Sequence, residues 1–179
     1  AEQGPKAIAP LVAVASGANR DAALAALRAV DCISHASAAP GSASRKEAAG
    51  ALAAAVLDAK VPLRVKHHLL DLLGSVGESD EGPVVSAVAK ALSETELRDQ
   101  ARKTLERIPG DAAAKAIEAA LEGATGEWLE ALIQTLGTKK ARCSVPALVR
   151  IAREGPAGRL AAAMALTRIG DSESIRAIT

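Results

Sequence analysis

Two adjacent histidines followed by an aspartate come closest to a metal site in this 179-residue chain. His68 and Asp71 are three residues apart, so on a helix they would share one face and could supply two metal ligands. A structural or catalytic site needs a third ligand, and the remaining histidine, His35, falls in a segment expected to be a loop. The pattern therefore favours surface histidines at His67 and His68, and we predict no metal and no other cofactor.

Two further features suggest binding, each with an ordinary structural alternative. Trp128 is the only aromatic residue among Phe, Trp and Tyr in the chain. Tryptophan is frequent at binding hot spots, but it would also fill a gap between the surrounding alanines. Lys139, Lys140 and Arg142 lie beside an expected helix N-terminus, where anions bind. A solvated loop is the alternative reading of these three cations.

The sequence contains no recognisable pattern for catalysis. It has no glycine-rich phosphate loop, no serine–histidine–aspartate arrangement and no cysteine set with metal-ligand spacing. Cys32 and Cys143 are read as free thiols, which favours a reducing compartment such as the cytoplasm. The 22 basic and 21 acidic residues give a net charge of +1, unlike the basic excess of a dedicated nucleic-acid-binding protein. We therefore predict that the chain is not an enzyme.

The composition predicts helices. Hydrophobic residues make up 49% of the chain and aromatic residues only 1%, and alanine is the commonest residue. Alanine and leucine lead the helix scale, whereas strands favour aromatic and β-branched residues. No apolar run approaches the roughly 20 residues that span a bilayer. We therefore predict an all-α protein of one domain, residues 1–179, with no membrane span.

One helical pattern recurs along the chain. In "RLAAAMALTRIG", residues 159–170, an arginine at position 0 is followed by small or apolar residues at +3, +6, +7 and +10 and by glycine at +11. These offsets place the apolar residues on one helical face. Including this one, the five copies begin at Arg20, Lys66, Arg98, Gly126 and Arg159. Three of the four spacings are about thirty residues, which is typical of a solenoid.

A second helix precedes each copy, so we expect repeated hairpins of a helix A followed by a helix B that carries the pattern. The expected repeats are residues 4–31, 44–77, 81–109, 111–137 and 143–170, with residues 171–179 beginning another A helix. Residues 32–44, with Pro40-Gly41, are expected to form an inserted loop because they are small and polar. This loop is either a tolerated insertion or a contact to a partner.

Glycines and aspartates mark the expected helix ends. Gly77, Gly137 and Gly170 close their copies where a helix C-terminus favours a left-handed residue. Asp111 and Asp171 come next as natural N-caps of the following A helices.

The pattern R-x-x-A-x-x-A-L-x-x-I-G-D resembles the HEAT-like repeats first named in phycobilisome lyases, and residues 159–171 match it nearly letter for letter. The resemblance extends over essentially the whole chain, with departures at Asp31, Pro109 and Gly126. It implies a right-handed α-solenoid of about five hairpins, with A helices on the convex side and B helices on the concave side. Such repeats occur in scaffolds, lyase subunits and enzymes alike, so the resemblance specifies the fold rather than the function.

We expect function to lie on the concave ridge formed by positions +1, +2, +5, +8 and +9 of the B helices. The predicted partner-binding residues on this ridge are Arg28, His67, His68, Asp71, Lys103, Glu127, Trp128 and Arg168. A regular array with an extended concave surface is typical of a binding scaffold, so we predict a non-enzymatic scaffold for a protein partner. The alternatives are an accessory lyase or carrier subunit for a tetrapyrrole-like group and, third, a nucleic-acid-binding protein.

Overall fold

The computed structural model describes residues 4–77, 82–154 and 157–170, and every regular element within these ranges is helical. The elements are η1 (Pro5–Ala7), α1 (Ile8–Ala15), α2 (Arg20–Ser37), α3 (Arg45–Leu57), α4 (Leu63–Val76), α5 (Gly82–Leu92), α6 (Arg98–Arg107), α7 (Asp111–Ala119), α8 (Gly126–Thr138), η2 (Arg142–Ser144), α9 (Val145–Glu154) and α10 (Arg159–Ile169). The predicted all-α class is confirmed. Among the helices so described, none is long and apolar enough to cross a membrane.

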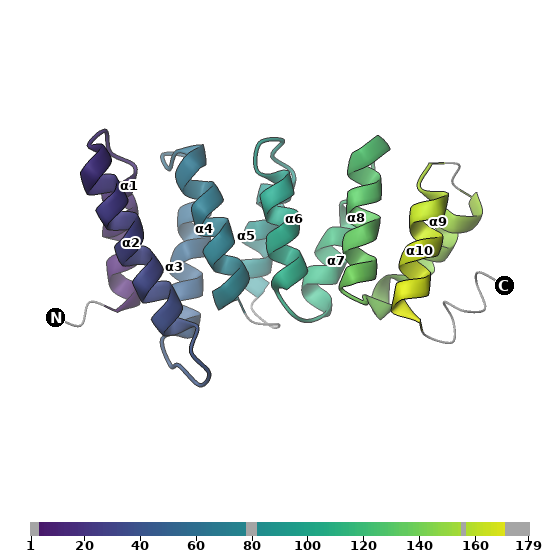
Figure 1. Cartoon of the computed structure of the whole chain (residues 1–179), viewed down its shortest axis with the longest axis horizontal. Helices are drawn as coiled ribbons and strands as arrows, with labels where there is room; N and C mark the ends of the chain where they lie inside the picture. Colours follow the sequence, from purple (N-terminus) through teal and green to yellow (C-terminus); the bar gives the residue numbers. More distant parts are fainter. Residues whose placement is uncertain (1–3, 78–81, 155–156, 171–179) are drawn as a thin grey trace.

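The helices lie in two rows along the length of the molecule (Figure 1). The odd-numbered helices form one row, the A row, and the even-numbered helices form the B row. Each odd helix packs on the even helix that follows it, and neighbours within each row pack in chain order, except that α7 meets η2 in place of α9. The B row therefore places side by side the five helices that carry the sequence pattern.

The apolar positions of the pattern form the core between the two rows. In α4, Leu69, Leu72, Leu73 and Val76 are buried, and the equivalent positions of α6, α8 and α10 are buried as well. In α2, Leu27 is half-buried at the position where the other copies are buried. Because burial of apolar surface contributes roughly 25 cal/mol per Å², this recurring stripe is what holds each B helix against the A row.

Small residues let α8 and α10 approach closely. A Cβ atom built on Gly137 of α8 would lie 2.8 Å from the Cα atom of Ala165 in α10 and 2.9 Å from its Cβ atom. Protein interiors are close-packed, so a methyl group at this point would force the two helices apart. The contact between these residues therefore fixes the register of α10 along α8.

The predicted inserted loop, residues 32–44, is wrong in its first half. α2 continues to Ser37, so the connection to α3 contains only residues 38–44. Ser34 and Ser37 are buried and follow Val30 at helical spacing, which extends the buried face of α2 by almost two turns. The serines and alanines suggested a loop by their composition, but their spacing keeps the helical period.

The prediction that a left-handed glycine ends the B helix is confirmed at one of its three positions. Gly170 ends α10 in the left-handed conformation, with φ 66°. Gly77 follows α4 with extended backbone, at φ −64° and ψ 137°. Gly137 lies inside α8, which ends at Thr138. Both glycines instead allow the next B helix to approach, because an added Cβ atom would lie 3.0 Å from Cγ1 of Ile108 at Gly77 and 2.8 Å from Cα of Ala165 at Gly137.

The prediction that Asp111 is an N-cap residue is wrong by one position. Asp111 is the first residue of α7, and Gly110 is the N-cap residue, with φ 90° and no side-chain hydrogen bond to the helix. The carboxylate of Asp111 still lies in the first turn, where it complements the helix dipole. Asp171 and the expected A helix of residues 171–179 lie outside the described residues.

Candidate functional site

The positions of the pattern differ in whether their side chains contact the preceding B helix, the following B helix or neither. Side chains at +2, +6 and +9 contact the preceding B helix, as His68, Thr104 and Thr135 do. Side chains at 0 and +4 contact the following B helix, as Arg98 and Arg102 do. The exposed side chains at +1, +5 and +8 form the outer surface of the B row, together with Arg168 at +9, which makes no hydrogen bond or ion pair with α8 among the described residues. We call these exposed side chains the B-helix face: Asp21, Ala25, Arg28, His67, Asp71, Asp99, Lys103, Glu127, Gln134, Leu160, Met164, Thr167 and Arg168.

His68 joins α4 to α2. Its Nε2 atom lies 2.6 Å from Oδ1 of Asp31, and the two side chains are 34% and 32% exposed. Asp71, the second ligand of the conceivable metal pair, does not meet His68 but pairs with Arg107 of α6. His67, the adjacent histidine, is exposed. The two groups that could have shared a metal ion are therefore each engaged by a different helix.

Asp71 joins α4 to α6. The Nη2 atom of Arg107 donates to Oδ1 of Asp71 at 2.7 Å and to its backbone carbonyl at 3.0 Å. The guanidinium crosses Gly74, where an added Cβ atom would lie 2.5 Å from Nε of Arg107. Asp71 is thus part of the packing between two B helices as well as part of the exposed surface.

Trp128 joins α6 to α8. Its ring is half-buried, packs against the hydrophobic core and lies beneath the guanidinium of Arg98, whose carbon is 4.9 Å from the ring centroid. The sequence left open whether this tryptophan is a binding hot spot or a filler between alanines. In the structure it fills the junction, and its contact with Arg98 has cation–π geometry.

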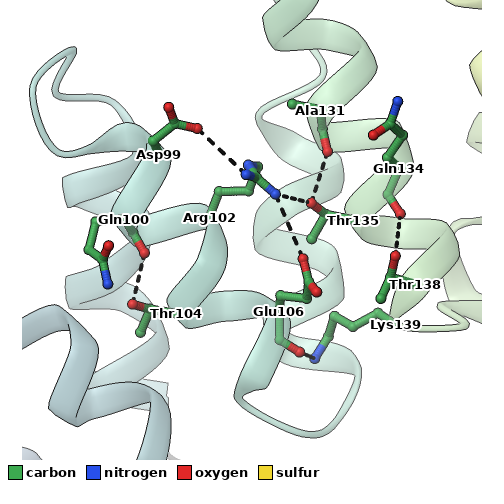
Figure 2. Close-up of polar contacts among 10 residues, drawn as sticks. All are labelled: Asp99, Gln100, Arg102, Thr104, Glu106, Ala131, Gln134, Thr135, Thr138 and Lys139. Atoms are coloured by element: carbon green, nitrogen blue, oxygen red, sulfur yellow. Dashed lines mark hydrogen bonds and ion pairs between the residues drawn. The ribbon is translucent and has the colours of Figure 1, made fainter.

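Arg102 makes a second link between α6 and α8. Figure 2 shows its guanidinium reaching Thr135 of α8, with Asp99 and Glu106 of its own helix on either side. Nη1 of Arg102 donates to Oγ1 of Thr135 at 2.7 Å, and this hydroxyl donates to the carbonyl of Ala131 at 2.8 Å. The link holds the middle of the B row in a fixed arrangement.

Five of the eight predicted partner-binding residues remain exposed without such links. They are Arg28, His67, Lys103, Glu127 and Arg168. Within residues 4–77, 82–154 and 157–170, the structure gives none of these five side chains a hydrogen bond or an ion pair. The B row therefore combines locked side chains at the helix junctions with uncommitted side chains on its outer surface.

The exposed charges on the B-helix face follow a partial order along the helices. Acidic residues occupy position +1 in three helices, at Asp21, Asp99 and Glu127. Basic residues lie farther along, at Arg28 and Lys103 in the middle of α2 and α6 and at Arg168 in the last turn of α10, whereas Asp71 places an acidic group in the middle of α4. The helix dipole favours the acidic groups of the first turns and Arg168 in the last turn. The face consequently has an acidic edge along the helix N-termini and, farther along the helices, a set of exposed cations, Arg28, Lys103 and Arg168, that we call the basic edge.

Two apolar residues on the B-helix face were absent from the predicted site. Leu160 is 75% exposed and Met164 is 51% exposed, one turn apart on α10. The equivalent first positions of the other copies are Asp21, His67, Asp99 and Glu127, so Leu160 is the apolar exception. That comparison between copies is the sequence signal that could have found it.

The three cations of the predicted anion site have separate environments. Lys139 donates through Nζ to the carbonyls of Ile108 and, at 3.4 Å, of Glu106, so it covers the C-terminal end of α6. Burial lowers the pKa of Lys139 from its ordinary value of 10.5. Lys140 is exposed with φ 52°, and Arg142 is exposed in η2. Lys139 is therefore committed to the fold rather than free for an anion.

A groove of about 670 Å³ lies between the C-terminal end of α7 and α9. Apolar residues such as Leu129 and Ile151 line it together with charges of both signs, Lys115 and Arg150 against Glu118 and Glu122. Nothing in these side chains selects one class of ligand.

The described residues contain no group of three or more His, Cys, Asp or Glu side chains placed to hold a metal ion. Both cysteines are free, Cys32 exposed and Cys143 half-buried. No protein-family model matches the chain, and no curated protein is significantly similar to it in sequence. Function is therefore inferred from the B-helix face itself.

Proposed function

We propose that the chain is a right-handed α-solenoid of five HEAT-like hairpins and acts as a non-enzymatic scaffold that binds a protein partner on its B-helix face. The face would be the concave side of the solenoid, as in the repeats that the sequence resembles. The observation that carries the proposal is the partial order of charge on this face. Arg28 and Lys103 are exposed on helices whose junctions are locked by other side chains, and Arg168 is exposed on α10, which approaches α8 closely at Gly137 and Ala165.

The fixed junctions favour binding because less conformational entropy is lost when the binding surface is already ordered. Ties such as His68–Asp31 and Arg107–Asp71 hold neighbouring helices, so the exposed charges keep their spacing without a partner. Complementary charge then guides a partner into one register. The partner expected from this pattern presents basic residues to the acidic edge and acidic residues to the basic edge.

The proposal is tested by capture of partners from an extract of the source cells on the immobilised chain. The variant R28E/K103E/R168E reverses three exposed charges of the basic edge. Its matched control, K46E/K90E/R153E, reverses three exposed charges of the A row. We expect a captured protein to be lost by the first variant and kept by the second, with both variants folded by circular dichroism. Equal capture by all three forms, or loss by the control alone, would overturn the proposal.

A further inference from the structure

The apolar pair on α10 has charged neighbours on two sides. Glu130 of α8 is exposed and lies two helical turns before Gly137, which faces Ala165 of α10, so Glu130 lies on the side of α8 nearest α10. Arg168 follows Met164 by one turn on α10 and is exposed. From Glu130 across the α10 part of the B-helix face, the order is therefore acidic, apolar, apolar and basic.

The contact of Gly137 with Ala165 sets the spacing of this array. At about 1.5 Å of rise per residue, Glu130 lies about 10 Å from that contact towards the N-terminal end of α8. On the same scale, Leu160 lies about 7 Å from it in the same direction, and Arg168 lies about 4 Å from it in the opposite direction. The apolar pair thus lies between the acidic and the basic group.

Such an array is complementary to itself after rotation by a half turn. A two-fold axis running across α10, midway between Leu160 and Met164, places α10 of a second copy antiparallel on the first. Leu160 then meets Met164 of the second copy, and Arg168 comes opposite Glu130 of the second copy. Two-fold interfaces require this kind of self-complementary surface and are the commonest in homo-oligomers.

We propose that a second copy of the chain binds at the α10 end of the B-helix face, through Leu160 and Met164 at the centre and Glu130–Arg168 pairs on either side. This inference rests on the proposed function, because it identifies one partner of the same face. The reciprocal charges favour a second copy over an anionic membrane, which Glu130 would repel. The small apolar area predicts a weak, concentration-dependent dimer.

The first experiment measures the mass of the purified chain by sedimentation equilibrium over a range of micromolar concentrations. We expect the average mass to rise from that of one chain towards that of two. The variant L160S/M164S should remain monomeric throughout. The control L24S/L63S changes two leucines of 47% and 46% exposure and should dimerise as the unchanged chain does. A chain that stays monomeric, or that associates equally well as L160S/M164S, would overturn the inference.

The second experiment separates contacts between copies from effects within one copy. Each of E130R and R168E places like charges opposite one another in its own dimer, so each alone should dimerise several-fold more weakly. A mixture of the two restores both opposite-charge pairs and should form a mixed dimer at least as readily as the unchanged chain. A mixture that dimerises no more readily than either variant alone would contradict the two-fold arrangement. A monomeric chain that still captures a protein through Arg28 and Lys103 would leave the proposed function standing.

Discussion

Nε2 of His68 lies 2.6 Å from Oδ1 of Asp31, and this contact joins two neighbouring B helices across 37 positions of sequence. Both side chains are about two-thirds buried, so the interaction is partly shielded from water. The pair shows why charged residues of the B row cannot be read simply as a solvated surface.

We predict that His68 and Asp31 are energetically coupled. In a double-mutant cycle of H68A, D31A and H68A/D31A, the coupling should be about 0.5–1 kcal/mol of the free energy of unfolding, as expected for a partly exposed hydrogen bond between side chains. Urea denaturation at neutral pH measures it. The neighbouring pair H67A with D31A serves as the control and should be additive, because His67 is exposed. Additivity for both pairs would contradict the link.

Gly137→Ala tests the close approach of α8 and α10. The added methyl group would overlap Ala165, and overpacking of this kind costs about 1–3 kcal/mol. Gly50→Ala is the matched control, because Gly50 lies inside α3 with nothing within 4 Å of an added Cβ atom. It should stabilise the protein by about 0.5–1 kcal/mol through helix propensity alone. Stabilisation by both substitutions, measured in urea, would show that the helices do not approach as described.

Trp128 should report on the junction between α6 and α8. Trp128→Ala removes half-buried packing and the cation–π contact, so we expect a loss of stability of about 1–3 kcal/mol. Arg98→Ala removes only the contact above the ring and should cost less, about 0.5–1 kcal/mol. Because the chain has one tryptophan, its fluorescence follows this junction directly. Fluorescence of Trp128 that is unchanged by Arg98→Ala would contradict the ring contact.

Lys139 should make stability depend on pH in the alkaline range. Burial lowers its pKa in the folded state below 10.5. Between the lowered pKa and 10.5 the unfolded chain binds more protons than the folded chain, so the free energy of unfolding rises with pH in that window. Subtracting the pH profile of Lys139→Gln from that of the unchanged chain should isolate this rise. Lys90→Gln, at an exposed lysine, should give no such difference; an equal difference for both would contradict the prediction.

The sequence predicted the all-α class and the five B helices, because the apolar positions of the pattern repeat at helical spacing and become the core. It failed where composition and spacing disagreed, as in residues 32–37, which look like a loop but continue the buried face of α2. It left open whether Trp128 binds a partner or fills a gap, and it did not predict that Trp128 and the exposed Asp71 each contact a neighbouring B helix. Such contacts depend on which helices become neighbours, and a local pattern does not contain that information.

The most direct measurement of the central claim is the dissociation constant of a captured partner for the chain and its two charge-reversal variants. We expect at least tenfold weaker binding by R28E/K103E/R168E, since these exposed cations lie on the B-helix face. The dissociation constant of K46E/K90E/R153E, whose charges lie on the A row, should be unchanged. Equal affinity for all three proteins, or weaker binding by the A-row variant alone, would contradict binding on the B-helix face.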